Sequence, residues 1–362
     1  MNKREAQSPD FRHGVKITWI FNDVEISGGV KSVFCISNCL VERGHEVNII
    51  YPLIPMEITP KKVITKGYKA IAIFKKRSRG GLWFDLKANL IRVPYLSNCF
   101  IPDADVIIAT WWETAYVVKK LSPSKGKKFY FIQHYETWGG AKDKVDGSYR
   151  LGLNNIVNSQ WTKEQVEAVG GKVVSKIFHA PDWGQFKEVY VGRHEGIRIL
   201  MQYRKDAWKG IDDGILAFVI AHSQHNDTQL VMFGREKGDV PDWVEFHVNP
   251  TNEELNLLYR SCDIFLFSSV VEGFGMPPME AMCCKLPVVT TKVGVVSEFS
   301  VDDEIALVSE PNNPQGLVDN LVKLIGDGNL RKKIGLAGYD YVKKFTWESA
   351  TNQLLRSLDA QS

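Results

Sequence analysis

Short apolar runs alternate with helical patterns along the first half of the chain. The run 16–21 predicts a strand, a loop over 22–29 follows, and apolar positions three and four residues apart predict a helix over about 30–42. Gly44 ends that helix. Further apolar runs stand at 47–51, 106–109, 129–132 and 155–157. Strands that alternate with helices predict a doubly wound α/β domain.

A second series of the same kind begins at 198–201. A helix over about 210–222 follows, and then come strands at 229–233, 263–267 and 287–290. The chain has 362 residues, which exceeds the usual limit for one hydrophobic core. We therefore expect two α/β domains, 1–181 and 182–345, with the boundary near Pro181.

Composition agrees with a soluble globular protein, because hydrophobic residues make up 44% and charged residues 24% of the chain. The net charge of +3 is too small to argue for nucleic-acid binding. The first ten residues are polar, and no apolar run approaches the roughly 18 residues of a membrane span. The six cysteines lack zinc-site spacing and are read as buried free thiols in a reducing cytosol. A cytoplasmic protein is expected.

The most informative segment contains Glu272 and Glu280, eight positions apart, with two glycines and two prolines between them. It follows the apolar run 263–268, and Pro277 and Pro278 would stand in the first turn of the next helix. In an open α/β sheet, ligands bind at the loop that leaves a strand's carboxyl end. Both carboxylates can then face one crevice and bind a ligand rich in hydroxyls. The alternative is that both are solvated surface charges.

This segment resembles the Glu-x7-Glu motif of retaining glycosyltransferases of family 4, which have the GT-B fold. In that family the first glutamate contacts the donor sugar and the second holds the ribose of the nucleotide. The resemblance implies these roles for Glu272 and Glu280, with Phe274, Gly275 and Met276 in the same donor site. It also implies two Rossmann-like domains that face a central cleft, and a C-terminal helix, about 346–362, that crosses back to the first domain.

Gly28 and Gly29 stand between the first strand and its helix. Two glycines there allow close approach to a donor phosphate and positive φ, while the helix start supplies N–H donors. Plain turns use the same dipeptide. The Gly-x-Gly-x-x-Gly fingerprint of dinucleotide oxidoreductases is absent at this position, which argues against NAD chemistry.

The second domain opens with a strand that leads into a basic loop over 202–210. The resemblance implies that Arg204 and Lys209 hold the donor pyrophosphate and neutralise charge on the leaving group. A guanidinium pairs bidentately with phosphate, and an ammonium adds a compact second charge. Tyr203 replaces the glycine that the family usually has before the arginine. Lys205 is a competing cation, and the alternative is that Arg204 and Lys209 are exposed loop cations without a ligand.

His134 stands just after the apolar run 129–132, with Gln133 between them. Family members often carry a histidine in this loop, where it contacts the donor sugar across the cleft, so the resemblance implies that His134 is catalytic together with Glu272. Glu136 is then placed to bind acceptor hydroxyls. Lone histidines are more often structural than catalytic, and that alternative stays open.

No metal or other cofactor is expected. Asp103-Ala104-Asp105 matches the Asp-x-Asp metal motif of GT-A glycosyltransferases, but here it precedes the strand 106–109 instead of following one. We interpret it as an acidic loop, and 302–304 as a solvated turn.

The resemblance implies transfer of a sugar from a nucleoside diphosphate to a hydroxyl of a saccharide or lipid-linked saccharide, with retention of configuration, in polysaccharide or glycan biosynthesis. UDP-hexose is the family's commonest donor class, and users of GDP-mannose and dTDP-rhamnose carry similar motifs. Glu272 would position the sugar and not attack it. The alternatives are a sugar-nucleotide epimerase, a phosphorylase, for which no pyridoxal-binding lysine is identified, and a non-catalytic sugar-nucleotide-binding protein.

A basic segment at 61–80 contains eight lysines and arginines and no acidic residue, and Leu82, Trp83 and Phe84 follow it. Such a segment can dock on anionic lipid, as a peripheral protein at the inner face of a membrane would do for a lipid-linked acceptor. A solvated basic face explains it equally well.

Overall fold

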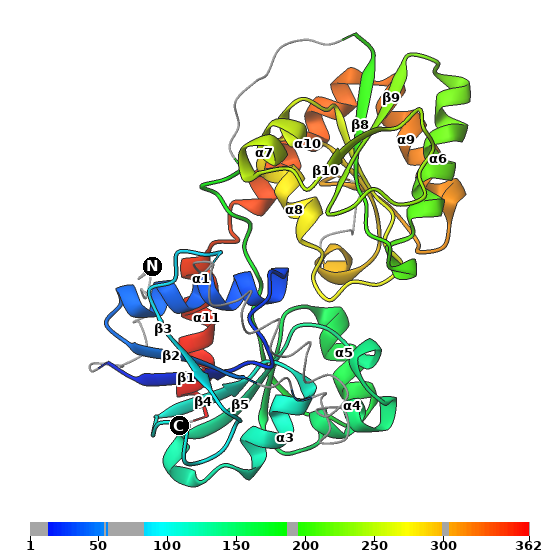
Figure 1. The fold of residues 1–362 in the computed structure, drawn as a ribbon. Helices are drawn as coiled ribbons and strands as arrows, with labels where there is room; N and C mark the ends of the chain where they lie inside the picture. Colours follow the sequence, from blue (N-terminus) through cyan, green and yellow to red (C-terminus); the bar gives the residue numbers. More distant parts are fainter. Residues whose placement is uncertain (1–13, 54–55, 57–82, 187–194, 299–303, 362) are drawn as a thin grey trace, which may run out of the picture. The chain divides into compact units, whose positions relative to one another are not determined.

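The computed structural model describes residues 14–53, 56, 83–186, 195–298 and 304–361. The chain divides into two compact units (Figure 1). The N-terminal unit comprises the described parts of Met1–Asn158, Thr162–Ile177 and Trp347–Ser362. The C-terminal unit comprises the described parts of Ser159–Trp161 and Phe178–Thr346. The basic residues of the segment 61–80 lie outside the described residues.

The described strands of the N-terminal unit form one parallel sheet in the order β3-β2-β1-β4-β5-β6-β7. Their bounds are Lys16–Ile20 (β1), Glu46–Pro52 (β2), Asn89–Val93 (β3), Val106–Ala109 (β4), Lys127–Ile132 (β5), Asn154–Val157 (β6) and Val173–Lys176 (β7). The chain runs outward from β1 to one edge and then returns to build the other half from β4. The sheet is therefore doubly wound.

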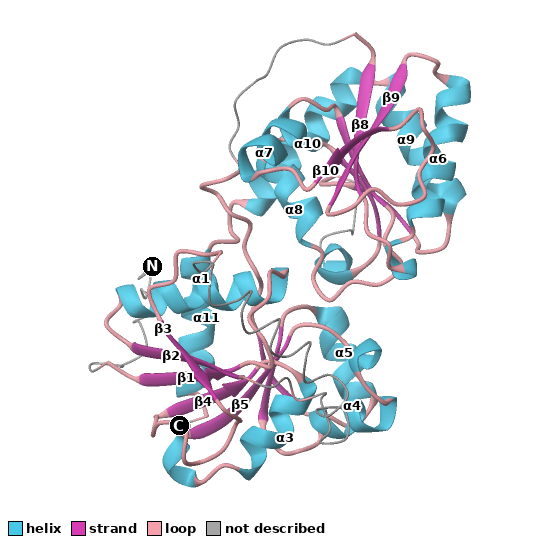
Figure 2. Ribbon diagram, in the orientation of Figure 1, coloured by secondary structure: helices cyan, strands magenta, loops and turns pink. Residues whose placement is uncertain are grey.

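Alternate side chains of this sheet enter two separate cores, as the two-residue period of a strand requires. On β4, for example, Ile108 belongs to one core and Ile107 to the other. The first core is closed by α1 (Gly28–Glu42) and α11 (Trp347–Asp359), and the second by α3 (Trp112–Lys120), α4 (Lys142–Tyr149) and α5 (Gln160–Ala168) (Figure 2). Burial on both faces explains why the central strands are continuous apolar runs.

The C-terminal unit repeats this arrangement with the strand order β10-β9-β8-β11-β12-β13. The strands are Ile197–Gln202 (β8), Thr228–Gly234 (β9), Glu245–Val248 (β10), Ile264–Phe267 (β11), Val288–Thr291 (β12) and Leu307–Ser309 (β13). The helices are Ile211–Gln224 (α6), Asn252–Arg260 (α7), Met276–Cys283 (α8), Pro314–Gly326 (α9) and Gly328–Val342 (α10). Helices α6 and α9 close one core against the sheet, and α8 and α10 also contact β12.

The two parallel α/β sheets confirm the predicted fold class, but the hydrophobic pattern did not indicate β3, β7, β10 and β13. These four strands are the edges of the two sheets. Three of them, β3, β7 and β10, carry mostly half-buried or exposed residues, and β13 has only three residues. An edge strand has one neighbour and less cover, so its sequence need not be a continuous apolar run. None of the described helices is both long and apolar enough to cross a bilayer.

The C-terminal helix α11 is expected to stabilise the N-terminal unit strongly. Leu354 is 1% exposed and lies in the core shared with α1. Leu354→Ala should lower the free energy of unfolding by about 3 kcal/mol, because it removes buried carbon and leaves a cavity. Urea unfolding measures this, with exposed Arg356→Ala on the same helix as the control. Equal effects of the two substitutions would contradict the prediction.

Candidate functional site

The centre of the C-terminal sheet is the point where its strand order reverses. β8 pairs directly with β11, while the chain continues from β8 to β9 on one side and from β11 to β12 on the other. The loops that leave β8 and β11 therefore diverge, which is where doubly wound sheets bind ligands. The first loop carries Arg204 and Lys209, and the second carries Glu272. The structure thus brings two separately predicted segments to one place.

Lys209 and Glu272 form an ion pair across these two loops. Lys209 Nζ lies 2.7 Å from Glu272 Oε1, and the two side chains are only 17% and 10% exposed. Ser269 Oγ donates a second hydrogen bond, 2.8 Å long, to the same carboxylate oxygen. The carboxylate is therefore held in one orientation by a cation and a hydroxyl.

Gly210 allows the two loops to meet. It has φ +59°, and a Cβ at this position would lie 2.1 Å from the carbonyl oxygen of Ser268, just after β11. The backbone N–H of Val270 donates to the carbonyl of Trp208 at 2.7 Å, which ties the same two loops together. A larger residue at 210 would be strained in conformation and would separate the loops.

Arg204 is a solvent-accessible member of this region. Its guanidinium donates to Asp206 at 3.2 Å, and its side chain is 45% exposed. The competing Lys205 pairs with Glu236 at 3.0 Å on the open surface. Tyr203 is buried and packs against Phe246 with ring centroids 5.6 Å apart.

The second glutamate of the motif stands on α8, as the sequence predicts. Gly275 precedes the helix with φ +89°, and prolines occupy its first turn. Glu280 accepts a 3.0 Å hydrogen bond from the hydroxyl of Tyr259, a fully buried residue of α7. Burial, with the charge of Glu280 as a smaller contribution, raises the pKa of Tyr259 well above its ordinary value of 10, so the phenol remains a donor.

Phe274 has its side chain inside the unit. It is 4% exposed and stacks on His179 with ring centroids 4.8 Å apart. Burial lowers the pKa of His179 to about 3, so this imidazole is neutral. The hydrophobic pattern did not single out His179, which lies after the edge strand β7. Met276 is the first residue of α8 and is half-buried.

Gly28 and Gly29 are the first two residues of α1, at the carboxyl end of β1 in the N-terminal unit. Neither has positive φ, so that part of the expectation is wrong. Space explains the second glycine: a Cβ at Gly29 would lie 3.2 Å from the side-chain amide of Gln133, after β5. Ser27 caps the helix by accepting from the N–H of Val30 at 3.2 Å.

His134 and Glu136 follow β5, as predicted. The two side chains differ in burial and in their contacts. His134 is half-buried, and its ring stands perpendicular to that of Trp138 with centroids 4.4 Å apart. Glu136 is 3% exposed, and its Oε2 accepts from the N–H of Trp112 at 2.8 Å and from the hydroxyl of Tyr130 at 3.0 Å. Burial raises the pKa of Glu136 to about 8. These contacts give Glu136 a structural task at the start of α3.

The described residues contain no group of three or more His, Cys, Asp or Glu side chains that could hold a metal ion. Asp103 pairs with Lys125 at 2.8 Å, and Asp105 accepts from the backbone N–H of Lys16 at 2.8 Å. Both carboxylates therefore serve the loop that enters β4, which agrees with the structural interpretation of this acidic tripeptide.

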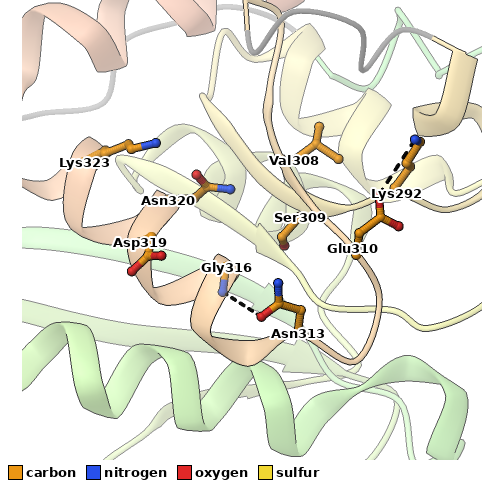
Figure 3. A pocket seen from close by; sticks show the side chains of 9 residues that line it. All are labelled: Lys292, Val308, Ser309, Glu310, Asn313, Gly316, Asp319, Asn320 and Lys323. Atoms are coloured by element: carbon orange, nitrogen blue, oxygen red, sulfur yellow. Dashed lines mark hydrogen bonds and ion pairs between the residues drawn. The ribbon is translucent and has the colours of Figure 1, made fainter.

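A polar pocket of about 420 Å³ lies at the carboxyl ends of β12 and β13, beside the start of α9 (Figure 3). Lys292 and Glu310 stand on one side of it, 3.8 Å apart, and Asp319, Asn320 and Lys323 on the other. None of the predicted site residues lines this pocket.

Comparison with known proteins agrees with this geometry. Residues 185–341, most of the C-terminal unit, match the family described as Glycosyl transferases group 1. The HepE protein of Anabaena, solved in complex with UDP and glucose, covers 96% of this chain and 100% of its own with a TM-score of 0.73 and 14% identity. The predicted GT-B class, with two parallel-sheet α/β domains, is thereby confirmed.

Two curated relatives illustrate the range of similarity. An uncharacterized glycosyltransferase of Methanocaldococcus jannaschii is 32% identical over 172 residues, 46% of this chain and 45% of the relative. The match therefore spans less than half of that relative's length. A phosphatidyl-myo-inositol mannosyltransferase of Mycobacterium leprae is 22% identical over 370 residues, 92% of this chain and 93% of the relative.

The Lys209–Glu272 pair is expected to stabilise the folded protein mainly because each of these poorly hydrated charges neutralises the other. Lys209→Met should lower the free energy of unfolding by about 3 kcal/mol, because it leaves a poorly hydrated carboxylate without its cation. Adding Glu272→Gln should restore much of that loss. Urea unfolding of both single variants and the double variant measures the coupling. Lys205→Met, in the exposed pair, is the control and should have no measurable effect; additive losses at 209 and 272 would refute the prediction.

Glu136 is expected to make stability depend on pH. Its pKa is about 8 in the folded protein against an ordinary 4.5, so the folded state keeps a proton that the unfolded chain releases. The stability from this group is complete below about pH 4.5 and is lost as the pH rises through about 8. Glu136→Gln removes the titration, so its advantage over the wild type should grow from pH 5 to pH 8.5 in urea unfolding. Exposed Glu253→Gln is the control, and parallel profiles for Glu136→Gln and wild type would contradict the assignment.

Proposed function

We propose that this protein is a retaining glycosyltransferase that moves a sugar from a nucleoside diphosphate to a hydroxyl of a saccharide or lipid-linked saccharide. The observation that carries the proposal is the Lys209–Glu272 pair at the strand-order reversal, followed on α8 by Glu280. This cluster lies within the residues matched by the group 1 family. An epimerase or a binding protein would need no acceptor, and product analysis separates these alternatives.

The diphosphate needs positive charge, and two cations of the β8 loop supply it in the proposal. An ammonium has three N–H donors, and Glu272 takes one from Lys209, so a phosphate oxygen can approach the same group. Arg204 is solvent-accessible and can turn from Asp206 to make a bidentate contact. With these cations present, the proposed mechanism uses no metal ion or other cofactor.

Glu280 would bind the ribose hydroxyls of the nucleotide. Tyr259 donates to one of its carboxylate oxygens and fixes the direction of the group. A carboxylate held in this way accepts two hydroxyl hydrogen bonds without reorganising. Glu272, fixed by Lys209 and Ser269, would accept from hydroxyls of the transferred sugar in the same manner.

In the proposed reaction, the bond between the anomeric carbon and the diphosphate oxygen breaks, and its electron pair leaves with the diphosphate. The acceptor oxygen bonds to the same carbon on the same face, and its proton passes to the departing phosphate oxygen. Lys209 and Arg204 stabilise the growing negative charge. His134 would contact the sugar near the reacting carbon. No covalent sugar–enzyme bond is required.

UDP is the first nucleotide to test, since the HepE structure contains UDP and glucose, and GDP and dTDP are the alternatives. We expect one nucleoside diphosphate among UDP, GDP and dTDP to raise the Tm clearly, because a ligand of the native state stabilises it by mass action. Glu280→Ala should weaken that binding about 10- to 100-fold, the cost of losing a charge-assisted hydrogen bond. Glu272→Gln should bind the nucleotide nearly as wild type and transfer sugar at least about 100-fold more slowly.

Exposed Glu253→Ala on α7 is the matched control and should behave as wild type in both assays. Nucleoside diphosphate release that requires an acceptor identifies transfer, whereas interconversion of the donor alone identifies an epimerase. The proposal fails if none of the three nucleotides changes the Tm, or if both glutamate variants keep wild-type binding and turnover.

A further inference from the structure

The N-terminal unit presents a cluster of three aromatic rings after the carboxyl ends of β4 and β5. Trp111 follows β4, and His134 and Trp138 follow β5. The ring of Trp138 lies 4.4 Å from that of His134 and 6.2 Å from that of Trp111, centroid to centroid. Trp138 is 51% exposed, although large aromatic side chains are usually well buried.

Two glycines build this cluster by allowing the β5 loop to lie against α3. A Cβ at Gly139 would lie 2.2 Å from the ring of Trp111, and a Cβ at Gly140 would lie 2.5 Å from the ring of Trp112. The indole N–H of Trp112 donates to the carbonyl of Gly139 at 3.3 Å. A side chain at 139 or 140 would therefore require either the loop or the adjacent indole ring to shift.

Glu136 holds the same loop in place through hydrogen bonds in the interior of the unit. Its carboxylate accepts from the backbone N–H of Trp112 and from the hydroxyl of Tyr130, both within the unit's interior. The loop is thus fixed immediately before Trp138, in the turn Thr137–Gly139. A side chain held in place before binding loses little conformational entropy when a ligand arrives, so the exposed ring is organised for contact.

The size of the exposed surface restricts its partner. One half-exposed indole is far smaller than the roughly 1,000 Å² that a specific protein interface requires. Stable membrane docking needs a broad apolar face, which one ring does not provide. An indole combines a flat apolar face with a polar edge, and a pyranose ring has a matching face of C–H groups with hydroxyls at its rim.

A second observation also points to a ligand. The indole N–H of Trp111 is buried and has no hydrogen-bond partner among the described residues. Other buried atoms of the described residues share this state, the indole N–H of Trp19 in the core among them, and a water or a ligand is one way in which such a donor is satisfied.

We propose that Trp138, supported by Trp111 and His134, is the platform on which a pyranose ring of the acceptor stacks. The inference rests on the proposed transferase function and narrows it, because it makes the acceptor a saccharide that is recognised through its ring face. Since His134 contacts Trp138, the stacked ring lies beside the histidine assigned to the reacting centre. Glu136 acts on the acceptor only through the position of this loop.

The test uses the full-length protein on an array of immobilised saccharides, with the nucleotide that raises its Tm present. Wild type should bind a subset of the saccharides. Trp138→Ala should lose at least about tenfold in affinity for that subset, and Trp138→Phe should keep most of it, because a planar ring remains. Trp243→Ala in the C-terminal unit is the matched control, since Trp243 is also 51% exposed.

The platform proposal is wrong if Trp138→Ala binds saccharides with wild-type affinity, or if the wild type binds none of them. Nucleotide Tm shifts measured on the same variants separate this outcome from failure of the transferase proposal. A normal nucleotide shift with unchanged saccharide binding in Trp138→Ala removes the platform alone. Saccharide binding that depends on Trp138 without any nucleotide shift removes the transferase and leaves a saccharide-binding protein.

Discussion

A parallel sheet buried on both faces can place polar chemistry only at the ends of its strands, and the reversal of strand order selects one pair of ends. In the C-terminal sheet that pair is β8 and β11, and in the N-terminal sheet it is β1 and β4. Lys209 and Glu272 follow the first pair. Gly28 follows β1, and Trp111 and Trp112, at the start of α3, follow β4. The candidate residues are therefore gathered by topology and not by closeness in the sequence.

Two buried carboxyl groups in this protein, Glu272 and Glu136, meet the cost of burying a charge in different ways. Glu272 has a cation 2.7 Å away and a hydroxyl on the same oxygen. Glu136 accepts from two neutral donors, and among the described residues no cation contacts it; burial accordingly raises its pKa to about 8. The first carboxylate is oriented by both of its partners, and the second fixes the loop that carries Trp138. Glu272 was a candidate through its motif and Glu136 through its place after His134, and the structure shows that their surroundings differ in charge.

The sequence predicts what local pattern determines. Central strands are visible because burial on both faces demands apolar runs, and the strand, loop and helix around Glu272 and Glu280 are visible because glycine and proline mark their limits. Edge strands are less buried and need not be continuous apolar runs, so this pattern does not reveal them. The contact of Lys209 with Glu272 joins residues 63 positions apart, and the burial of Glu136 depends on Tyr130 and Trp112. Such facts arise only when separate segments pack, so no single window of sequence contains them.

The tyrosine before Arg204 carries one more consequence. A Cβ at Gly238 would lie only 1.6 Å from the hydroxyl oxygen of Tyr203, so the phenol occupies space that Gly238 leaves open. The two positions share a single volume, and bulk at one excludes bulk at the other. Among homologous chains, loss of the glycine before the arginine should coincide with gain of a glycine at the position of 238. Covariation of this kind would let the cationic loop keep its backbone path while the residue before the arginine changes.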